Sequence, residues 1–253
     1  MKKIVFASVI VILCSVVYSQ PNKTTTAPLK NNVHLKVFNQ AIISGDLNSA
    51  ITALNYYISE QGSNSTYTDT LAMLYMQQGG YPQCFYWVEQ RMVGKPEDNT
   101  LLEMKGICLD KLQQPKEAIV VYEKLFGKTK SPFHAYKLME LQYGIKRLAE
   151  CIVTANAAER LQYKPEYVMS YNVGEQTGRT YLQAGVFNIH ALALYDLDQK
   201  AEAKSYFAKA VALDSNFVLA RQNLEAVIAA EKGPGKVNPN NPNQQTNPAN
   251  KQN

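Results

Sequence analysis

The sequence has few of the residues that build metal centres. Its 253 residues include only four cysteines and three histidines. No Cys, Asp or Glu accompanies a histidine at metal-ligand spacing. We therefore expect no metal site and interpret the histidines as ordinary helical residues: His34, His134 and His190.

The cysteine count also argues against a disulfide framework. Cys14 lies inside an apolar N-terminal run, where Leu13 precedes it and Ser15 continues the run, so we do not expect lipidation there. Cys84, Cys108 and Cys151 remain, and an odd number cannot pair completely. Buried thiols acting as small apolar groups are the favoured interpretation. A Cys84–Cys108 bridge is the alternative, and it requires a compatible Cα separation.

Catalytic and nucleic-acid-binding signals are missing as well. The chain has no glycine-rich phosphate loop, no G-x-S-x-G motif and no plausible histidine partner for Cys151. The net charge of +5 includes Lys2 and Lys3, and no basic block stands out. We expect no enzyme activity, no cofactor and no nucleic-acid partner.

Alternating runs of β-branched residues are nearly absent, whereas helical periodicity is widespread. This pattern predicts an all-α fold. Residues 162–182 are the exception, because Pro165, Gly174 and Gly178 interrupt the helical pattern and tyrosines alternate with small or polar residues. They predict a small non-helical insertion with a short extended segment. It is either a bridge between two blocks of helices or a tyrosine-rich contact loop.

The N-terminus has the layout of a secretory signal peptide. A basic start precedes an apolar run from Ile4 to Val17, followed by a permissive cleavage site at Ser19–Gln20. We expect a signal peptide over 1–19, a flexible lead-in over 20–30 and an exported mature protein without stable membrane insertion. An uncleaved N-terminal anchor remains the alternative.

A 34-residue period organises the rest of the chain. Small residues recur at Ala50, Cys84 and Ala118, each four residues before a larger one. Turn residues occur five positions before each of them, at Gly45, Gly79 and Gln113. Between Val186 and Asn216, two amphipathic helices show the same arrangement of small and aromatic positions. A helical hairpin of this kind buries its apolar face only by stacking on the next one.

These residues resemble the tetratricopeptide repeat, a 34-residue helix–turn–helix unit. Ala203-x3-Phe207-x2-Ala210 matches the second-helix pattern, with Phe187 and Ala191 at first-helix positions. The resemblance implies a right-handed α-solenoid with repeats at 31–64, 65–98, 99–132 and 184–217. A degenerate unit is expected at 131–161, with Ala149 at its small position and Gly144 at its turn. A capping helix is expected at 217–231 and a disordered, Asn- and Pro-rich tail at 233–253.

The resemblance also implies an inner groove, lined by the first helices, that binds a peptide or a segment of a partner protein. Repeat one contributes Asn32, Leu35 and Asn39. The expected groove residues of the later units are Asp69, Met73, Met76 and Gln77, then Glu103, Ile107, Asp110 and Lys111, then His134, Leu138 and Leu141. Methionines beside acids would suit an apolar or basic segment. Simple surface exposure explains these residues equally well.

The expected function is a non-catalytic scaffold or adaptor that binds another protein or peptide in the cell envelope. One alternative is a membrane-tethered assembly factor held by an uncleaved N-terminus. The other is an enzyme subunit whose site lies in the 162–182 insertion, with Tyr167, Tyr171 and Arg179 as its residues.

Overall fold

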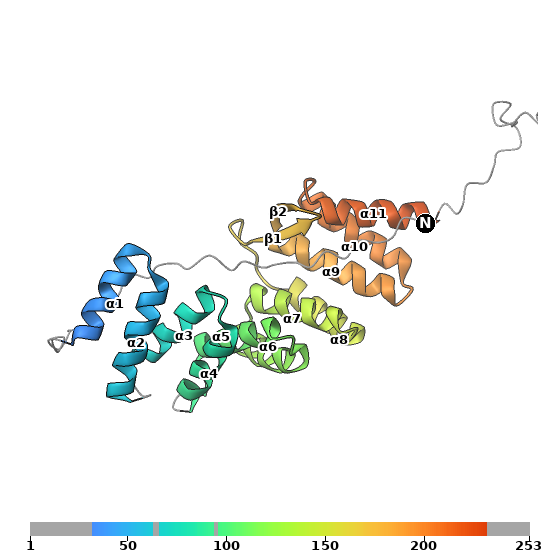
Figure 1. Ribbon diagram of the computed structural model, residues 1–253. Helices are drawn as coiled ribbons and strands as arrows, with labels where there is room; N and C mark the ends of the chain where they lie inside the picture. The colour runs from blue at the N-terminus through green and yellow to red at the C-terminus, as the bar shows by residue number, and fades with distance from the viewer. Residues whose placement is uncertain (1–31, 63–65, 94–95, 232–253) are drawn as a thin grey trace, which may run out of the picture.

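The computed structural model describes residues 32–62, 66–93 and 96–231, which form eleven helices and a two-stranded sheet (Figure 1). The helices are α1 (Val33–Ser44), α2 (Leu47–Gln61), α3 (Thr68–Gln77), α4 (Tyr81–Met92), α5 (Asn99–Lys111), α6 (Pro115–Thr129), α7 (Pro132–Gly144), α8 (Leu148–Glu159), α9 (Leu182–Asp196), α10 (Lys200–Leu213) and α11 (Val218–Glu231). The strands are β1 (Val168–Val173) and β2 (Gln176–Tyr181). The expected helical solenoid with a small non-helical insertion is confirmed. The expected signal peptide, lead-in and tail lie outside the described residues.

The helices stack as consecutive antiparallel pairs. Each first helix packs on its own second helix, as α1 does on α2, and each second helix packs on the next first helix, as α4 does on α5. The buried side chains of the described residues divide into four clusters along the array. Stability is therefore distributed over the interfaces between neighbouring hairpins.

The three small residues that define the 34-residue period, Ala50, Cys84 and Ala118, have no exposed surface. In each hairpin, two residues 16 positions apart, one on each helix, also lie in or beside the buried clusters. These pairs are Phe38 and Leu54, Ala72 and Val88, Gly106 and Tyr122, Met139 and Ala155, and Ala191 and Phe207. Either helix can supply the larger member, provided that the pair fills the space at native density.

The third hairpin has the most unequal pair. A Cβ added at Gly106 of α5 would lie 2.8 Å from the ring of Tyr122 on α6. Tyr122 is almost fully buried, with 1% of its surface exposed. The glycine therefore allows the tyrosine to cross the backbone of α5.

The turns inside the hairpins share one backbone conformation. The residue five positions before each small residue has a positive φ, between 60° and 75°. Glycine occupies this position at Gly45 and Gly79, whereas the last three hairpins use Gln113, Lys146 and Asp198. A left-handed conformation costs a residue with a side chain roughly 1–2 kcal/mol relative to glycine.

The fourth hairpin corrects our expected frame. Ala149, the expected small residue, is exposed, whereas Cys151 has no exposed surface. Lys146 has the left-handed turn conformation, and Gly144 is the last residue of α7. The small residue of this unit, Cys151, thus follows Ala118 by 33 residues, one fewer than the 34-residue period.

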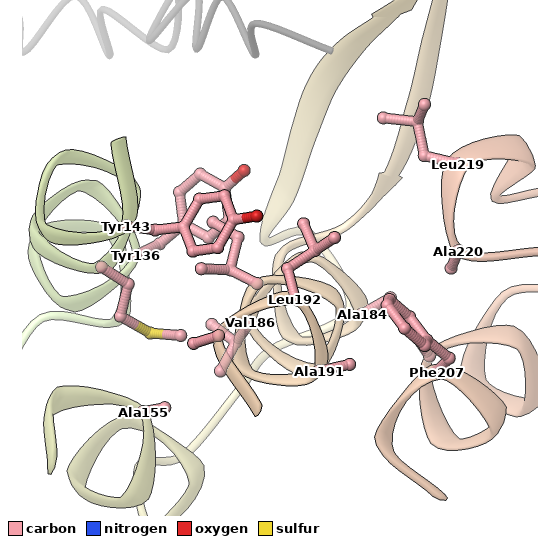
Figure 2. Close-up of a cluster of buried hydrophobic side chains, with 14 of the residues drawn as sticks. Tyr136, Tyr143, Ala155, Ala184, Val186, Ala191, Leu192, Phe207, Leu219 and Ala220 are labelled. Carbon is pink, nitrogen blue, oxygen red and sulfur yellow. The ribbon is translucent and has the colours of Figure 1, made fainter. Parts of the chain in front are cut away.

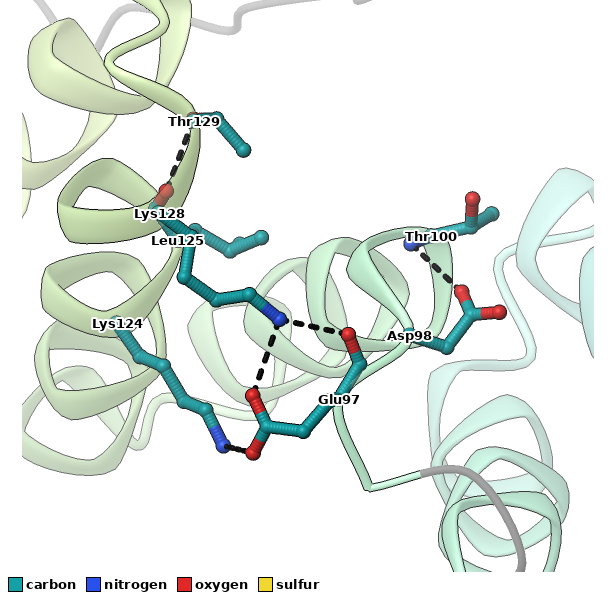
Figure 3. Close-up of polar contacts among 7 residues, drawn as sticks. All are labelled: Glu97, Asp98, Thr100, Lys124, Leu125, Lys128 and Thr129. Atoms are coloured by element: carbon teal, nitrogen blue, oxygen red, sulfur yellow. Dashed lines mark hydrogen bonds and ion pairs between the residues drawn. The ribbon is translucent and has the colours of Figure 1, made fainter.

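Glu97 anchors the segment that leads into α5 (Figure 3). Its carboxylate accepts a hydrogen bond from Lys124 Nζ at 2.5 Å and one from Lys128 Nζ at 3.0 Å. These two lysines of α6, Lys124 first, lower the pKa of Glu97. Asp98 then caps α5 by accepting hydrogen bonds from the N–H groups of Thr100 and Leu101, so the start of α5 is fixed by side chains.

The insertion forms an antiparallel β-hairpin, which turns at Gly174 and Glu175. Gly178 lies inside β2 opposite Tyr171, whose ring occupies the space that a Cβ would take, 2.5 Å away. The Tyr171 hydroxyl donates to the Asn216 carbonyl at 3.2 Å and accepts from the Val218 N–H at 3.1 Å. These two hydrogen bonds attach the β-hairpin to the connection between α10 and α11.

The capping helix α11 packs on α10. It also contacts α9, because Asn223 Nδ2 donates to Asn188 Oδ1 at 3.2 Å. The hairpin and α11 thus close the C-terminal end of the described array.

Gly106→Ala should destabilise the protein by about 1–3 kcal/mol, because the new methyl group overlaps the Tyr122 ring, which has no space to move. Gly127→Ala is the matched control. Gly127 also lies inside a helix, but an added Cβ meets nothing within 4 Å there, so better helix propensity should stabilise by roughly 0.5–1 kcal/mol. Urea unfolding followed by circular dichroism measures both values. Equal effects at the two positions would contradict the close packing.

Gln113→Gly should stabilise the protein by about 0.5–1 kcal/mol. Relief of the left-handed conformation outweighs the extra freedom that glycine gives the unfolded chain. Glu123→Gly is the control, because Glu123 is exposed inside helix α6, where glycine lowers helix stability. Thermal unfolding should show opposite shifts in Tm for the two variants, and a lower Tm for Gln113→Gly would refute the interpretation.

Candidate functional site: the open face of α3 and α5

The residues expected to line a groove on the second and third hairpins are accessible to solvent. Met73 is 39% exposed, Gln77 and Lys111 are exposed, and the others are half-buried. We call these eight residues the open face: Asp69, Met73, Met76 and Gln77 of α3, and Glu103, Ile107, Asp110 and Lys111 of α5. It presents two methionines and an isoleucine among charged groups.

The expected groove residues of α1 are used differently. Asn32 caps α1 by accepting hydrogen bonds from the N–H groups of His34 and Leu35, and its amide donates to Glu60 at 3.0 Å. Leu35 is buried in the first cluster, and only Asn39 is exposed. The first helix therefore adds little to the open face.

Two expected groove residues of the fourth hairpin are buried. Leu138, with 3% of its surface exposed, and Leu141 pack in the cluster that includes Ile119 and Leu125. The reason is the corrected frame of the fourth hairpin, which follows the third by 33 residues. In that frame Tyr136 of α7, rather than His134, corresponds to Glu103 of α5. His134 is half-buried beside the open face, and its Nδ1 lies 2.8 Å from Thr129 Oγ1.

The β-hairpin covers the first helices from α7 onwards. Tyr167 packs edge-on against Phe133 of α7, with the ring centroids 5.1 Å apart. Met169 is buried, and its sulfur fills the space that a Cβ on Gly185 of α9 would occupy. A Cβ at that position would also lie 2.9 Å from the ring of Tyr136. Figure 2 shows Tyr136 pointing from α7 towards α9. The accessible part of the first-helix surface therefore ends at α7.

A half-buried ion-pair network joins α5 to α7 at the edge of the open face. Lys137 Nζ lies 2.9 Å from Asp110 Oδ2 and 2.6 Å from Glu140 Oε2. Burial alone would lower the pKa of Lys137, but Glu140 and Asp110 together raise it. Burial raises the pKa of Glu140, and Lys137 opposes that shift. Lys137 is thus held as a cation between two carboxylates.

Tyr122 places a hydroxyl group beneath this network. Its oxygen is buried and has no hydrogen-bond partner among the described residues. Burial raises the pKa of Tyr122, and the charges of Glu103 and Asp110 raise it further. Sequence reasoning missed this residue because its only signal is the glycine 16 positions earlier.

Ion pairs also flank the open face. Asp69 Oδ1 of α3 accepts from Arg91 Nε of α4 at 2.7 Å. Lys105 Nζ of α5 lies 2.8 Å from Glu89 Oε1 of α4. Both contacts connect a first helix to a neighbouring second helix, so they fix the two first helices of the open face.

The residues proposed for an enzyme site in the insertion have structural contacts. Tyr171 is buried and bonded to the backbone of the α10–α11 connection, and Tyr167 packs on Phe133. Arg179 is exposed. Beside the hairpin, an open pocket of about 370 Å³ is lined by Tyr163, Tyr167 and Tyr181 together with Leu213.

Other reactive side chains are buried. Cys84, Cys108 and Cys151 are free thiols with no exposed surface. His190 is buried, with its Nδ1 2.6 Å from Glu159 Oε1, and burial lowers its pKa although Glu159 opposes this. Within residues 32–62, 66–93 and 96–231, no group of His, Cys, Asp and Glu side chains could hold a metal ion. Over the same ranges, no helix has the length and apolarity needed to cross a membrane.

The tetratricopeptide repeat sequence model matches residues 184–217, which form α9 and α10. The resemblance to the tetratricopeptide-repeat family is confirmed for this hairpin by the sequence model and for the array by its fold. No curated protein sequence matches it. Its hairpins stack as tetratricopeptide repeats do, and the insertion separates the matched repeat from the preceding hairpins.

Solved tetratricopeptide-repeat structures resemble the chain in fold. The crystal structure of MamA protein superposes with a TM-score of 0.59 at 16% identity, covering 72% of this chain and 91% of that one. YrrB, described as a TPR protein with an unusual peptide-binding site, gives a TM-score of 0.58 at 16% identity over 79% and 90% of the two chains. A tetratricopeptide repeat protein from Parabacteroides merdae gives 0.59 at 14% identity over 78% and 72%. Identities this low establish the fold alone.

Lys137→Met should destabilise the protein by roughly 2–4 kcal/mol, because it leaves two half-buried carboxylates without their cation. The loss should shrink as the pH falls. Without Lys137 the folded-state pKa of Glu140 rises further above its unfolded value, so the folded state takes up the proton first. The deficit is therefore full above that raised pKa and decreases as the pH falls through it.

Denaturant unfolding between pH 7.5 and pH 5 measures this dependence. Lys116→Met is the control, since Lys116 is exposed on α6, away from the charges that act on Glu140, and its loss should change stability by less than about 0.5 kcal/mol. A pH-independent deficit for Lys137→Met would show that lost packing, rather than charge, causes it.

Proposed function

We propose that this protein is an exported, non-catalytic interaction scaffold that binds an extended segment of another cell-envelope protein on the open face of α3 and α5. The fold supports a protein–protein interaction scaffold. The site and the compartment are our proposal. The main observation in its support is that the surface of the first helices is accessible to solvent on α3 and α5, whereas the insertion covers it from α7 onwards.

The chemistry of the open face favours a peptide-like ligand. Met73 and Met76 offer flexible apolar surface that adapts to different side chains. Charged groups surround them and can orient a bound segment. The peptide-binding site named for YrrB, a protein of the same fold, gives this assignment further support.

Export rests on the N-terminal sequence, with its basic start, apolar run and cleavage site before Gln20. Mass spectrometry of the N-terminal peptide from the protein recovered from expressing cells should identify Gln20, or the pyroglutamate formed from it, as the first residue. A chain that still begins at Met1 and sediments with membranes would overturn export by cleavage and favour the membrane-tethered assembly factor.

Site-specific photo-crosslinking tests the binding face. A benzophenone amino acid at Met73 should give a discrete adduct with one envelope protein in intact cells, identified by mass spectrometry. The same group at Val120, which is 63% exposed on second helix α6, is the control and should give none. Adducts of equal yield at both positions, or at Val120 alone, would exclude the open face as the binding surface.

A further inference from the structure

The edge of the open face at α7 contains one polar group that the fold leaves unsatisfied and one carboxylate that it holds weakly. The Tyr122 hydroxyl is buried and has no hydrogen-bond partner among the described residues. Glu103 has one ion-pair contact, to His134 Nε2 at 3.9 Å, the longest such distance in the described part of the chain. Native proteins seldom leave a buried hydroxyl unpaired, because its desolvation is not compensated.

The two groups lie together. His134 lies beside both groups, because its Nε2 is 3.9 Å from Glu103 Oε1. The ring of Tyr122 is also beside His134, with centroids 6.3 Å apart. Glu103 is 37% exposed on its side chain and weakly held, so it can move aside to admit a ligand to the hydroxyl.

The neighbouring charges leave Glu103 uncompensated. Lys137 is engaged by Asp110 and Glu140, and Lys111 is exposed at the end of α5. A cationic side chain entering beside Glu103 would neutralise its carboxylate and give the phenol oxygen a donor. Arginine has five N–H donors and lysine three, and neither has an acceptor, so both suit two acceptors side by side.

We propose that Glu103 and Tyr122 form a recess that receives an arginine or lysine side chain of the bound partner segment. This inference rests on the function proposed above and specifies the chemistry of the partner. Gly106 has a role in it as well, because the lack of a side chain there allows Tyr122 to reach the open face from α6.

Binding of peptide pools tests the recess. Fluorescent nine-residue pools, randomised except for a central Arg, Lys, Gln or Glu, are titrated against the full-length mature protein by fluorescence anisotropy. We expect the Arg and Lys pools to bind about tenfold more tightly than the Gln pool, and the difference to fall as salt is raised from 50 to 500 mM. Equal binding of the Arg and Gln pools would overturn the recess.

Two variants separate binding from folding. Tyr122→Phe keeps the ring against Gly106 and removes only the unpaired hydroxyl. It should raise the Tm while reducing the preference for Arg over Gln at least threefold. Tyr163→Phe is the matched control. The Tyr163 hydroxyl donates to the Ala158 carbonyl at 3.0 Å, so its loss should lower the Tm and leave the preference unchanged. A preference that survives Tyr122→Phe would show that the hydroxyl has no part in binding.

Glu103→Gln supplies the charge test and should abolish the preference for Arg and Lys. An NMR spectrum with ¹³Cζ-labelled tyrosine reports contact directly, since the Tyr122 signal, assigned from Tyr122→Phe, should shift with the Arg pool and stay in place with the Gln pool. If Met73 crosslinks a partner but the pools bind equally, the proposed function stands and the recess is wrong. If the pools discriminate but no crosslink forms at Met73, the recess stands and the proposed function fails.

Discussion

The arrangement of the molecule depends on an interior space between the two helices of each hairpin that packed side chains fill. Every hairpin fills it with two residues 16 positions apart, and the larger one can come from either helix. Leu54 and Phe38 share the space almost equally, whereas Gly106 gives nearly all of it to Tyr122. Because either helix can supply the larger residue, the sequence can vary while the hairpins still stack on one another.

This constraint explains which parts of the fold could be predicted from sequence. The small residues Ala50, Cys84 and Ala118 and the turns at Gly45 and Gly79 repeat at equal spacing, so the first three hairpins are visible as a period. The fourth is hidden for two reasons. Its small residue, Cys151, comes one position earlier than the 34-residue period requires. Its larger interior residue, Met139, is on the first helix, and the smaller one, Ala155, is on the second.

The candidate site was only partly predictable. Family positions located the open face on α3 and α5, but they could not show that Leu138 is buried or that Asn32 is a helix cap. The covering of α7 by the insertion depends on contacts between residues far apart in sequence, such as Tyr167 with Phe133. The unpaired Tyr122 hydroxyl is likewise a property of the packed state, because a tyrosine at that position reads as core.

The β-hairpin also changes how the array responds to thermal fluctuation. In a linear stack, each unit can open after separating from its immediate neighbours. The β-hairpin and the adjacent Tyr167 contact α7, α9 and the connection into α11 at the same time, so we expect these elements to open together. Within the described residues, the helical hairpins from α1 to α6 have no such clasp, and we therefore expect them to open more independently than the C-terminal ones. The open face lies in this less protected half, where a ligand that rigidifies α3 and α5 would also slow their local unfolding.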